Sequence, residues 1–140
     1  MKSTILFFLF LSFNISFSQH QPIGKPIGTY SPAILVGNTL YISGQIGLHP
    51  DSSEINVDSI DQEIIQAIDN VGVILKQANF EFEDIVSVTI YMTDLEEYST
   101  MSKVYKKYFP NKNYPSRTVV EISRLPRDAQ FEISAIAIKK

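Results

Sequence analysis

The spacing of apolar residues divides the chain into segments of two kinds, which meet near residue 58. Before that point, two runs rich in β-branched and apolar residues, at 33–36 and 39–43, flank a Gly37-Asn38 dipeptide. This arrangement predicts a β-hairpin. Gly44 interrupts the second run, and a glycine inside a strand pattern indicates a bulge or a close approach of another group to the backbone.

From Asp58 onward, apolar residues recur at steps of three and four, which is the period of an amphipathic helix. The stripe consists of Ile60, Ile64, Ala67, Ile68, Val71, Ile74, Leu75 and Ala78. Asp58 or Ser59 can cap the start of this helix, with Gln62 three residues after Ser59 as the partner in a capping box. Asn79 is expected to end the helix in the left-handed conformation.

The second half of the chain continues with strand and helix patterns. Residues 85–92 predict a strand, and Asp94 with Glu97 predicts a capping box at the start of a second helix, which Pro110 ends. The apolar stripe of that helix comprises Leu95, Tyr98, Met101, Tyr105, Tyr108 and Phe109. Two more strands are expected at 116–123 and 130–138, separated by a turn at 125–128.

These elements predict a single α+β domain, with a mixed sheet of five or six strands and two helices on one face. Residues 20–32, which are rich in proline and glycine, are expected to form an extended lead-in. The sheet face away from the helices carries too many apolar residues for a surface in contact with water. We therefore expect that face to contact partner subunits.

Residues 1–18 have the pattern of a signal peptide. Lys2 precedes the apolar residues 5–17, and Ser16 and Ser18 supply small residues near a cleavage point before Gln19. The apolar stretch is shorter than the about 20 residues that a membrane-spanning helix needs. We predict cleavage after Ser18, a mature domain of residues 19–140, and an exported protein, periplasmic or secreted, without a stable membrane anchor. The alternatives are a buried N-terminal strand or helix, and an uncleaved anchor.

Composition excludes several kinds of chemistry. The chain has no cysteine, which excludes disulfides, thiolate metal sites and cysteine nucleophiles, and its two histidines are too few for a typical zinc site. We therefore expect neither a metal nor another cofactor. With 12 basic and 15 acidic residues, the net charge is −3, and the chain lacks the basic patch typical of nucleic-acid-binding proteins. We expect no nucleic-acid partner.

Arg117 is the first candidate site residue. It follows Tyr114-Pro115-Ser116 and begins a strand rich in valine. A guanidinium in this position needs a partner, and it can bind a carboxylate through two parallel hydrogen bonds. On this segment alone, a structural ion pair with Glu121 and the binding of a ligand explain the residue equally well.

Glu132 is the second candidate, within the otherwise apolar strand 131–138. Its carboxyl group either faces solvent or is partly buried with a raised pKa, and a pKa close to neutrality would let it relay protons to and from water. On sequence alone, the solvent-facing alternative is favoured. Tyr30, in a loop, and the Ser43-Gly44-Gln45 interruption are weaker candidates.

Taken together, these segments resemble the RidA/YjgF family of imine and enamine deaminases. The matching segments are residues 27–32, 37–46, 67–70, 93–95, 114–117, 120–128 and 132–137. Each segment alone is common, whereas their occurrence in this order is specific, and the resemblance covers nearly all of residues 22–139. It implies a chorismate-mutase-like α+β fold and a homotrimer with three active sites in clefts between subunits.

The resemblance also implies an activity, the hydrolysis of 2-imino acids to 2-keto acids and ammonia. Arg117 would hold the substrate carboxylate, and Glu132 would position and activate a water molecule. The other substrate-binding positions that the family implies are Tyr30, Ser43, Gly44, Ser102 and the backbone amide of Val119. Many members have cysteine at the position of Val119 and asparagine at that of Ser102, and the signal peptide also departs from the family pattern.

Two other functions compete with the deaminase. One is a non-catalytic trimer that keeps the carboxylate site and binds 2-keto acids or similar metabolites. The other is a nuclease, which the acidic balance of the chain disfavours.

Overall fold

The computed structural model describes residues 20–25, 28–55 and 59–140. The predicted signal peptide, residues 1–18, lies outside these ranges and stays a prediction. No helix in the described ranges is long and apolar enough to cross a membrane.

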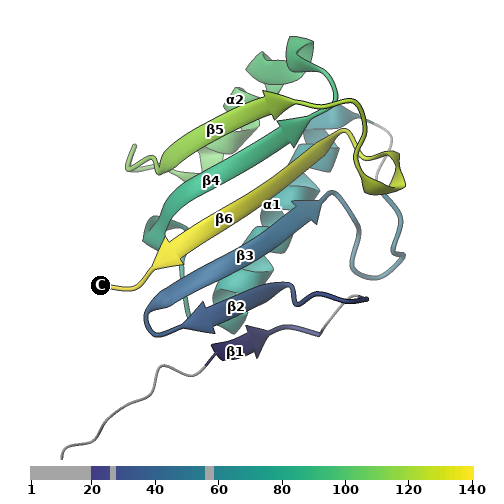
Figure 1. Ribbon diagram of the computed structural model, residues 1–140. Coiled ribbons are helices and arrows are strands. Elements are labelled where there is room, and N and C mark those ends of the chain that lie inside the picture. The colour runs from purple at the N-terminus through teal and green to yellow at the C-terminus, as the bar shows by residue number, and fades with distance from the viewer. Residues whose placement is uncertain (1–19, 26–27, 56–58) are drawn as a thin grey trace, which may run out of the picture.

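Six strands form one sheet, with two helices packed on one of its faces (Figure 1). The strands are β1 (His20–Ile23), β2 (Ala33–Val36), β3 (Thr39–Ile46), β4 (Ile85–Met92), β5 (Ser116–Glu121) and β6 (Phe131–Ile138). The helices are α1 (Ile60–Gln77) and α2 (Tyr98–Tyr105), and the 3-10 turns are η1 (Phe82–Asp84), η2 (Leu95–Glu97), η3 (Lys106–Tyr108) and η4 (Pro126–Asp128). The predicted α+β class and the two helices on one face are confirmed.

The strand order is β1-β2-β3-β6-β4-β5. Every neighbouring pair is antiparallel except β4 and β5, which are parallel and joined through α2. The last strand, β6, therefore lies in the middle of the sheet, between β3 and β4. The lead-in predicted at residues 20–32 contains a short strand, β1, whose Pro22 is tolerated because β1 lies at the edge of the sheet.

The predicted hairpin and first helix are confirmed, with one local correction. Asn79 has φ = 60°, the left-handed conformation expected after α1. Ser59 is the N-cap residue of α1, but its side chain makes no capping hydrogen bond. Its hydroxyl bonds to the carboxylate of Asp61 instead, which lowers the pKa of Asp61. The other proposed cap, Asp58, lies outside the described residues.

The second helix starts as a 3-10 turn and not directly as an α-helix. Asp94 caps this turn, because its carboxylate accepts a hydrogen bond from the Glu96 amide at 2.8 Å. The Leu95 amide donates to Oε2 of Glu121 at 2.9 Å, so the start of the helical segment is also bonded to the end of β5. The second helix is thereby fixed against the edge strand of the sheet.

The core lies between the sheet and the two helices. Alternate residues of β6 point into it: Phe131, Ile133, Ala135 and Ala137 are all buried. Glu63 of α1 is the buried carboxylate in this layer, at 1% exposure. It accepts hydrogen bonds from the backbone amides of Gln130 (2.7 Å) and Phe131 (3.1 Å), where β6 begins.

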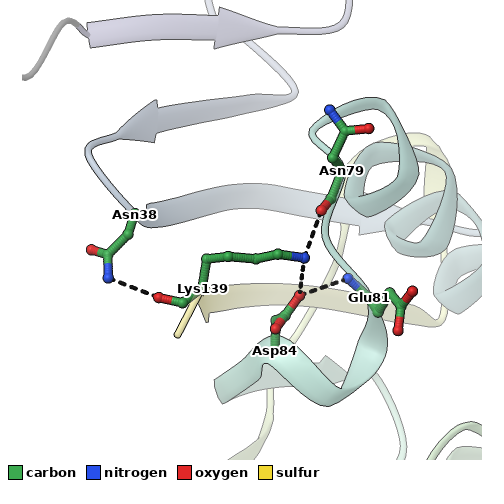
Figure 2. A network of polar contacts seen from close by, with 5 residues as sticks. All are labelled: Asn38, Asn79, Glu81, Asp84 and Lys139. Carbon is green, nitrogen blue, oxygen red and sulfur yellow. Dashed lines mark hydrogen bonds and ion pairs between the residues drawn. The ribbon is translucent and has the colours of Figure 1, made fainter.

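A polar cluster joins the C-terminal end of β6 to two distant segments (Figure 2). Nζ of Lys139 donates to the carbonyl of Asn79 at 2.7 Å and to the carboxylate of Asp84 at 3.1 Å. The Asn38 amide group donates to the backbone carbonyl of Lys139 at 2.8 Å. Asp84 also accepts a hydrogen bond from the Glu81 amide. The hairpin turn, the end of α1 and the last strand are thus held at one corner of the molecule.

The sheet face opposite the helices is open in the single chain and partly apolar. We call it the open face; it includes Tyr41, Thr89, Tyr91, Val120, Glu132, Ser134, Ile136 and Ile138, placed there by the strand register. Tyr41 is 49% exposed, and Val120 and Ile138 are 39% and 38% exposed. An apolar face of this kind is typical of a surface that contacts another protein.

Candidate active site

Arg117 lies on β5 with its side chain on the helix-facing side of the sheet. Its register partner on β4 is Val88, which is buried in the core. The guanidinium reaches α2, where Nη2 donates to the hydroxyl of Tyr98 at 2.9 Å and Nη1 approaches Sδ of Met101 at 3.9 Å. Cζ of Arg117 also lies 4.9 Å from the ring centroid of Tyr105, a cation–π contact.

No ion pair within the described ranges involves Arg117, although it is half-buried. Glu121, the predicted partner in a structural ion pair, is not paired with Arg117. Its carboxylate accepts a hydrogen bond from the Leu95 amide instead. The register places Glu121 opposite Met92, four residues along the strand from Arg117. A half-buried guanidinium held by aromatic and thioether groups, without a carboxylate from those ranges, is suited to an anionic ligand.

Two of the other predicted substrate-binding residues lie near Arg117. Val119 is on the same face of β5, paired with Ile90, and packs against the core. Ser102 is half-buried on α2, one residue after Met101. Because β5 is an edge strand, its outer edge has no neighbouring strand in the sheet, and backbone groups there are open to a ligand.

Glu132 lies on the open face, at the other side of the sheet. Its register partners are Ile46 on β3 and Tyr91 on β4. Burial raises the pKa of its carboxyl group above the ordinary value. The Glu132 side chain points away from the core, as the solvent-facing alternative predicts. It is nevertheless partly buried with a raised pKa, as the other alternative predicts.

Gly44 provides the space in which the Glu132 side chain lies. A Cβ atom at Gly44 would be 2.7 Å from Cδ and 3.1 Å from Cγ of Glu132, which is closer than van der Waals contact allows. The pairing of β3 with β6 shifts register between Ile42 and Gln45, so the interruption predicted at Gly44 is a β-bulge. The predicted bulge and the predicted close approach to the backbone are both confirmed, and the approaching group is Glu132.

Ser43 connects the bulge to the loop that carries Tyr30. Its hydroxyl donates to the carbonyl of Ser31 at 2.8 Å, and its amide donates to the carbonyl of Pro32 at 2.9 Å. Tyr30 itself is 51% exposed, so it is not a packed core residue. Ser43 therefore has a structural bond of its own and holds the Tyr30 loop against β3.

The structure divides the predicted site residues between the two sides of the sheet. Arg117, Val119 and Ser102 lie on the helix side, next to α2, whereas Glu132 and Gly44 lie on the open side. The strand β4 separates β5 from β6, so Arg117 and Glu132 are also two strands apart in the sheet order. One chain by itself does not bring the two candidate catalytic groups together.

Two hollows in the surface contain none of these residues. An open groove of ≈ 630 Å³ lies at the end of α1 and includes Gly72, Asn79 and Phe82. A smaller hollow of ≈ 130 Å³ lies on the open face between Tyr41 and Thr89. Within the described ranges, no group of three or more His, Asp or Glu side chains is arranged to hold a metal ion.

The residues that surround the two candidates are not evident from the sequence alone. Tyr98, Met101 and Tyr105 belong to the apolar stripe predicted for the second helix, and all three contact the Arg117 guanidinium. Their spacing of three and four residues places them on one face of α2. Only the structure shows that this face contacts Arg117 on β5. Gln45, the last residue of the predicted interruption, donates from its side-chain amide to the carbonyls of Ser43 and Gly44 in the bulge.

The sequence matches the protein family described as "Endoribonuclease L-PSP" over residues 19–139. The chain belongs to this family. Members also carry the RutC and RidA names, and the predicted membership in the RidA/YjgF family is confirmed. A RutC family protein of Pyrococcus abyssi is 40% identical over 126 residues, which cover 90% of this chain and 97% of that protein. The human 2-iminobutanoate/2-iminopropanoate deaminase is 40% identical over 113 residues, covering 81% of this chain and 82% of the human protein.

Solved structures of L-PSP family proteins have the same fold as this chain. Escherichia coli TdcF with bound serine superposes with a TM-score of 0.81 at 32% identity, over 86% of this chain and 99% of TdcF. RidA from an Antarctic Psychrobacter gives a TM-score of 0.80 at 31% identity, over 85% of this chain and 99% of that protein. These likenesses confirm the predicted chorismate-mutase-like fold.

Proposed function

We propose that this protein hydrolyses small 2-imino acids and their enamine tautomers to 2-keto acids and ammonia. The observation that carries the proposal is the half-buried guanidinium of Arg117, which has no carboxylate partner in the described ranges. The 40% identity to the human 2-iminobutanoate/2-iminopropanoate deaminase supports the same activity. Glu132, with its raised pKa, supplies the proton-transfer group that this reaction needs.

The two residues have separate roles in the proposed reaction. Arg117 binds the carboxylate of the imino acid and orients the C=N bond. Glu132 accepts a proton from a water molecule as the water oxygen bonds to the imine carbon. The imine nitrogen, protonated from solvent, becomes the amino group of a carbinolamine. The same carboxyl group then donates its proton to that nitrogen while the carbon–nitrogen bond breaks, and the carbinolamine hydroxyl releases its proton to solvent as the carbonyl forms, so the products are a 2-keto acid and ammonia. General acid–base assistance of this kind contributes about 10²–10⁴-fold.

The proposal requires a homotrimer with its sites between subunits. Arg117 and Glu132 lie on opposite sides of the sheet, so a site that uses both must combine residues of two chains. The apolar open face supports this assembly, because it gives a second chain a surface to bind. Each site would then take Arg117, Val119 and Ser102 from one chain, and Glu132, Gly44, Ser43 and Tyr30 from its neighbour.

A deaminase assay on the purified mature domain tests the proposal. An amino-acid oxidase generates 2-iminopropanoate in the cuvette, and semicarbazide traps the imine that remains. We expect wild-type protein to consume the imine faster than buffer does, and Arg117→Ala and Glu132→Ala to lose at least about 100-fold of that rate. A wild-type protein that binds pyruvate but gives no rate above buffer would instead be the non-catalytic carboxylate-binding trimer.

The family description raises the nuclease alternative again, but the net charge of −3 argues against it. Incubation with a labelled RNA, with and without the Arg117→Ala substitution, decides the matter. We expect no cleavage by either protein.

We also propose that the protein is exported after cleavage behind Ser18. The positive, apolar and small-residue regions of residues 1–18 support this proposal, and the family match begins only at residue 19. N-terminal sequencing of protein recovered from the cell exterior or periplasm should give Gln19 as the first residue. A first residue of Met1 in that fraction would contradict cleavage.

A further inference from the structure

We propose that Tyr98 is a positioning residue for Arg117, and that its hydroxyl group sets the orientation in which the guanidinium meets a substrate carboxylate. This inference rests on the proposed function, because it gives Tyr98 a part in the same carboxylate site. The sequence pattern places Tyr98 in the apolar stripe of a helix, and the comparisons with relatives say nothing of it.

The contact between the two side chains is short and directed. Nη2 of Arg117 donates to the Tyr98 hydroxyl at 2.9 Å, and Cζ of Arg117 lies 5.6 Å from the centre of the Tyr98 ring. Tyr105, seven residues later on the same face of α2, lies beneath the guanidinium with its ring centroid 4.9 Å from Cζ. Two aromatic residues of α2 thus hold one cation of β5.

The two tyrosines restrain different motions of the guanidinium. The ring of Tyr105 holds the guanidinium by a cation–π contact, which restrains its plane but not rotation within that plane. The hydrogen bond to Tyr98 fixes a particular N–H group and therefore restrains that in-plane rotation. A guanidinium has five N–H donors. Two of its nitrogens are directed at Tyr98 and Met101, and its remaining donors have no hydrogen-bond partner among the described residues, so they can meet a ligand.

Orientation matters here because a carboxylate binds a guanidinium best through two parallel N–H groups. A guanidinium that is held in one orientation before the substrate arrives loses less conformational freedom on binding. Tyr98 therefore contributes to substrate affinity without contacting the reacting carbon. Its 43% exposure shows that packing in the core does not explain the residue.

The test compares Tyr98→Phe with Tyr108→Phe. The first removes the hydroxyl that accepts from Arg117 and keeps the aromatic ring. The second makes the same chemical change at a tyrosine whose hydroxyl donates to Asp69 at 2.8 Å, away from Arg117. For each variant we would measure KM and kcat with 2-iminopropanoate, the Kd of pyruvate by calorimetry, and the melting temperature.

We expect Tyr98→Phe to raise KM and the Kd of pyruvate about three- to tenfold, as the loss of one hydrogen bond predicts. Its kcat should stay within about twofold of wild type, because Glu132 is untouched. Tyr108→Phe should leave KM, kcat and Kd within about twofold of wild type. A Tyr98→Phe protein with wild-type KM and Kd, or with a loss confined to kcat, would overturn the inference while leaving the proposed function intact. A wild-type protein that neither converts the imine nor binds pyruvate would overturn both.

Discussion

The carboxyl group of Glu132 lies where its neutral form is favoured over its charged form more than it is in an exposed glutamate. It projects from β6 onto the open face, between Ile46 and Tyr91, and partial burial disfavours the charged form. A carboxyl group in such a position can hold a proton at a pH where an exposed glutamate has lost it. At the scale of single residues, this property separates Glu132 from an ordinary surface glutamate.

The raised pKa of Glu132 predicts a pH-dependent stability. The native state holds the proton to higher pH than the unfolded chain does, so the resulting stabilisation is complete below the ordinary value of 4.5. It is lost as the pH rises through the raised native value. Glu132→Gln cannot ionise, so the melting temperature of the variant minus that of wild type should increase from below pH 4.5 towards neutrality. Scanning calorimetry at a series of pH values measures this difference, and a constant difference would show that the pKa is not raised.

Gly44 is expected to control where the Glu132 carboxylate lies. Gly44→Ala would place a methyl group against Cδ and Cγ of Glu132, and the flexible side chain would move aside while the backbone stays in place. We expect kcat to fall about 10–100-fold, since a misplaced general base loses most of its effect. The melting temperature should change little. Gly72→Ala, whose new methyl group meets Phe82 and no candidate site residue, serves as the control.

At the scale of elements, the position of β6 depends on a helix that precedes it by many residues. The Glu63 carboxylate of α1 accepts hydrogen bonds from the backbone amides of Gln130 and Phe131, where β6 begins and immediately before Glu132. Gly47 packs against the other side of Glu63, because a Cβ atom there would lie 2.5 Å from Cγ of Glu63. Helix, strand and preceding loop are thus fixed together at one buried point.

Removal of this carboxylate is expected to destabilise the fold. Glu63→Ala leaves the buried amide of Phe131 and the partly buried amide of Gln130 without this acceptor and opens a cavity, at a cost of about 3–5 kcal/mol in the free energy of unfolding. Glu63→Gln keeps one acceptor oxygen and should cost less than half as much. Urea denaturation followed by circular dichroism measures both values. Equal stability of wild type and Glu63→Ala would mean that β6 is held by its strand neighbours alone.

At the scale of the whole molecule, the open face is expected to be the contact between subunits. Tyr41→Asp places a charge on this face at a position that is 49% exposed in the single chain, so the folded chain should tolerate it. Val73→Asp makes a comparable change at 54% exposure on α1, outside the open face. We expect sedimentation analysis to show a trimer for wild type and Val73→Asp and a monomer for Tyr41→Asp. A trimer that persists in Tyr41→Asp would place the subunit contact elsewhere.

Much of this molecule follows from its amino-acid sequence alone. Apolar spacing determines the two helices and most of the strands, because periods of 3.6 and 2 are local properties of the chain. The Gly37-Asn38 turn and the left-handed Asn79 follow from local backbone preferences. The sequence pattern does not predict the short strand β1, because only pairing with β2 distinguishes it from an extended loop. Arg117 and Glu132 stand out in the sequence because each is a charged residue in an apolar strand.

Tertiary structure alone decided how those two residues relate to each other. The face on which a strand residue lies depends on the register of its strand, and a shift of one residue moves every side chain to the other face. Arg117 therefore faces α2, and Glu132 faces the open side of the sheet. The sequence patterns of the two strands do not predict this difference. The contacts of Arg117 with Tyr98 and Tyr105, and of Glu132 with Gly44, join residues far apart in the chain. They exist only because packing and strand pairing bring those residues within reach.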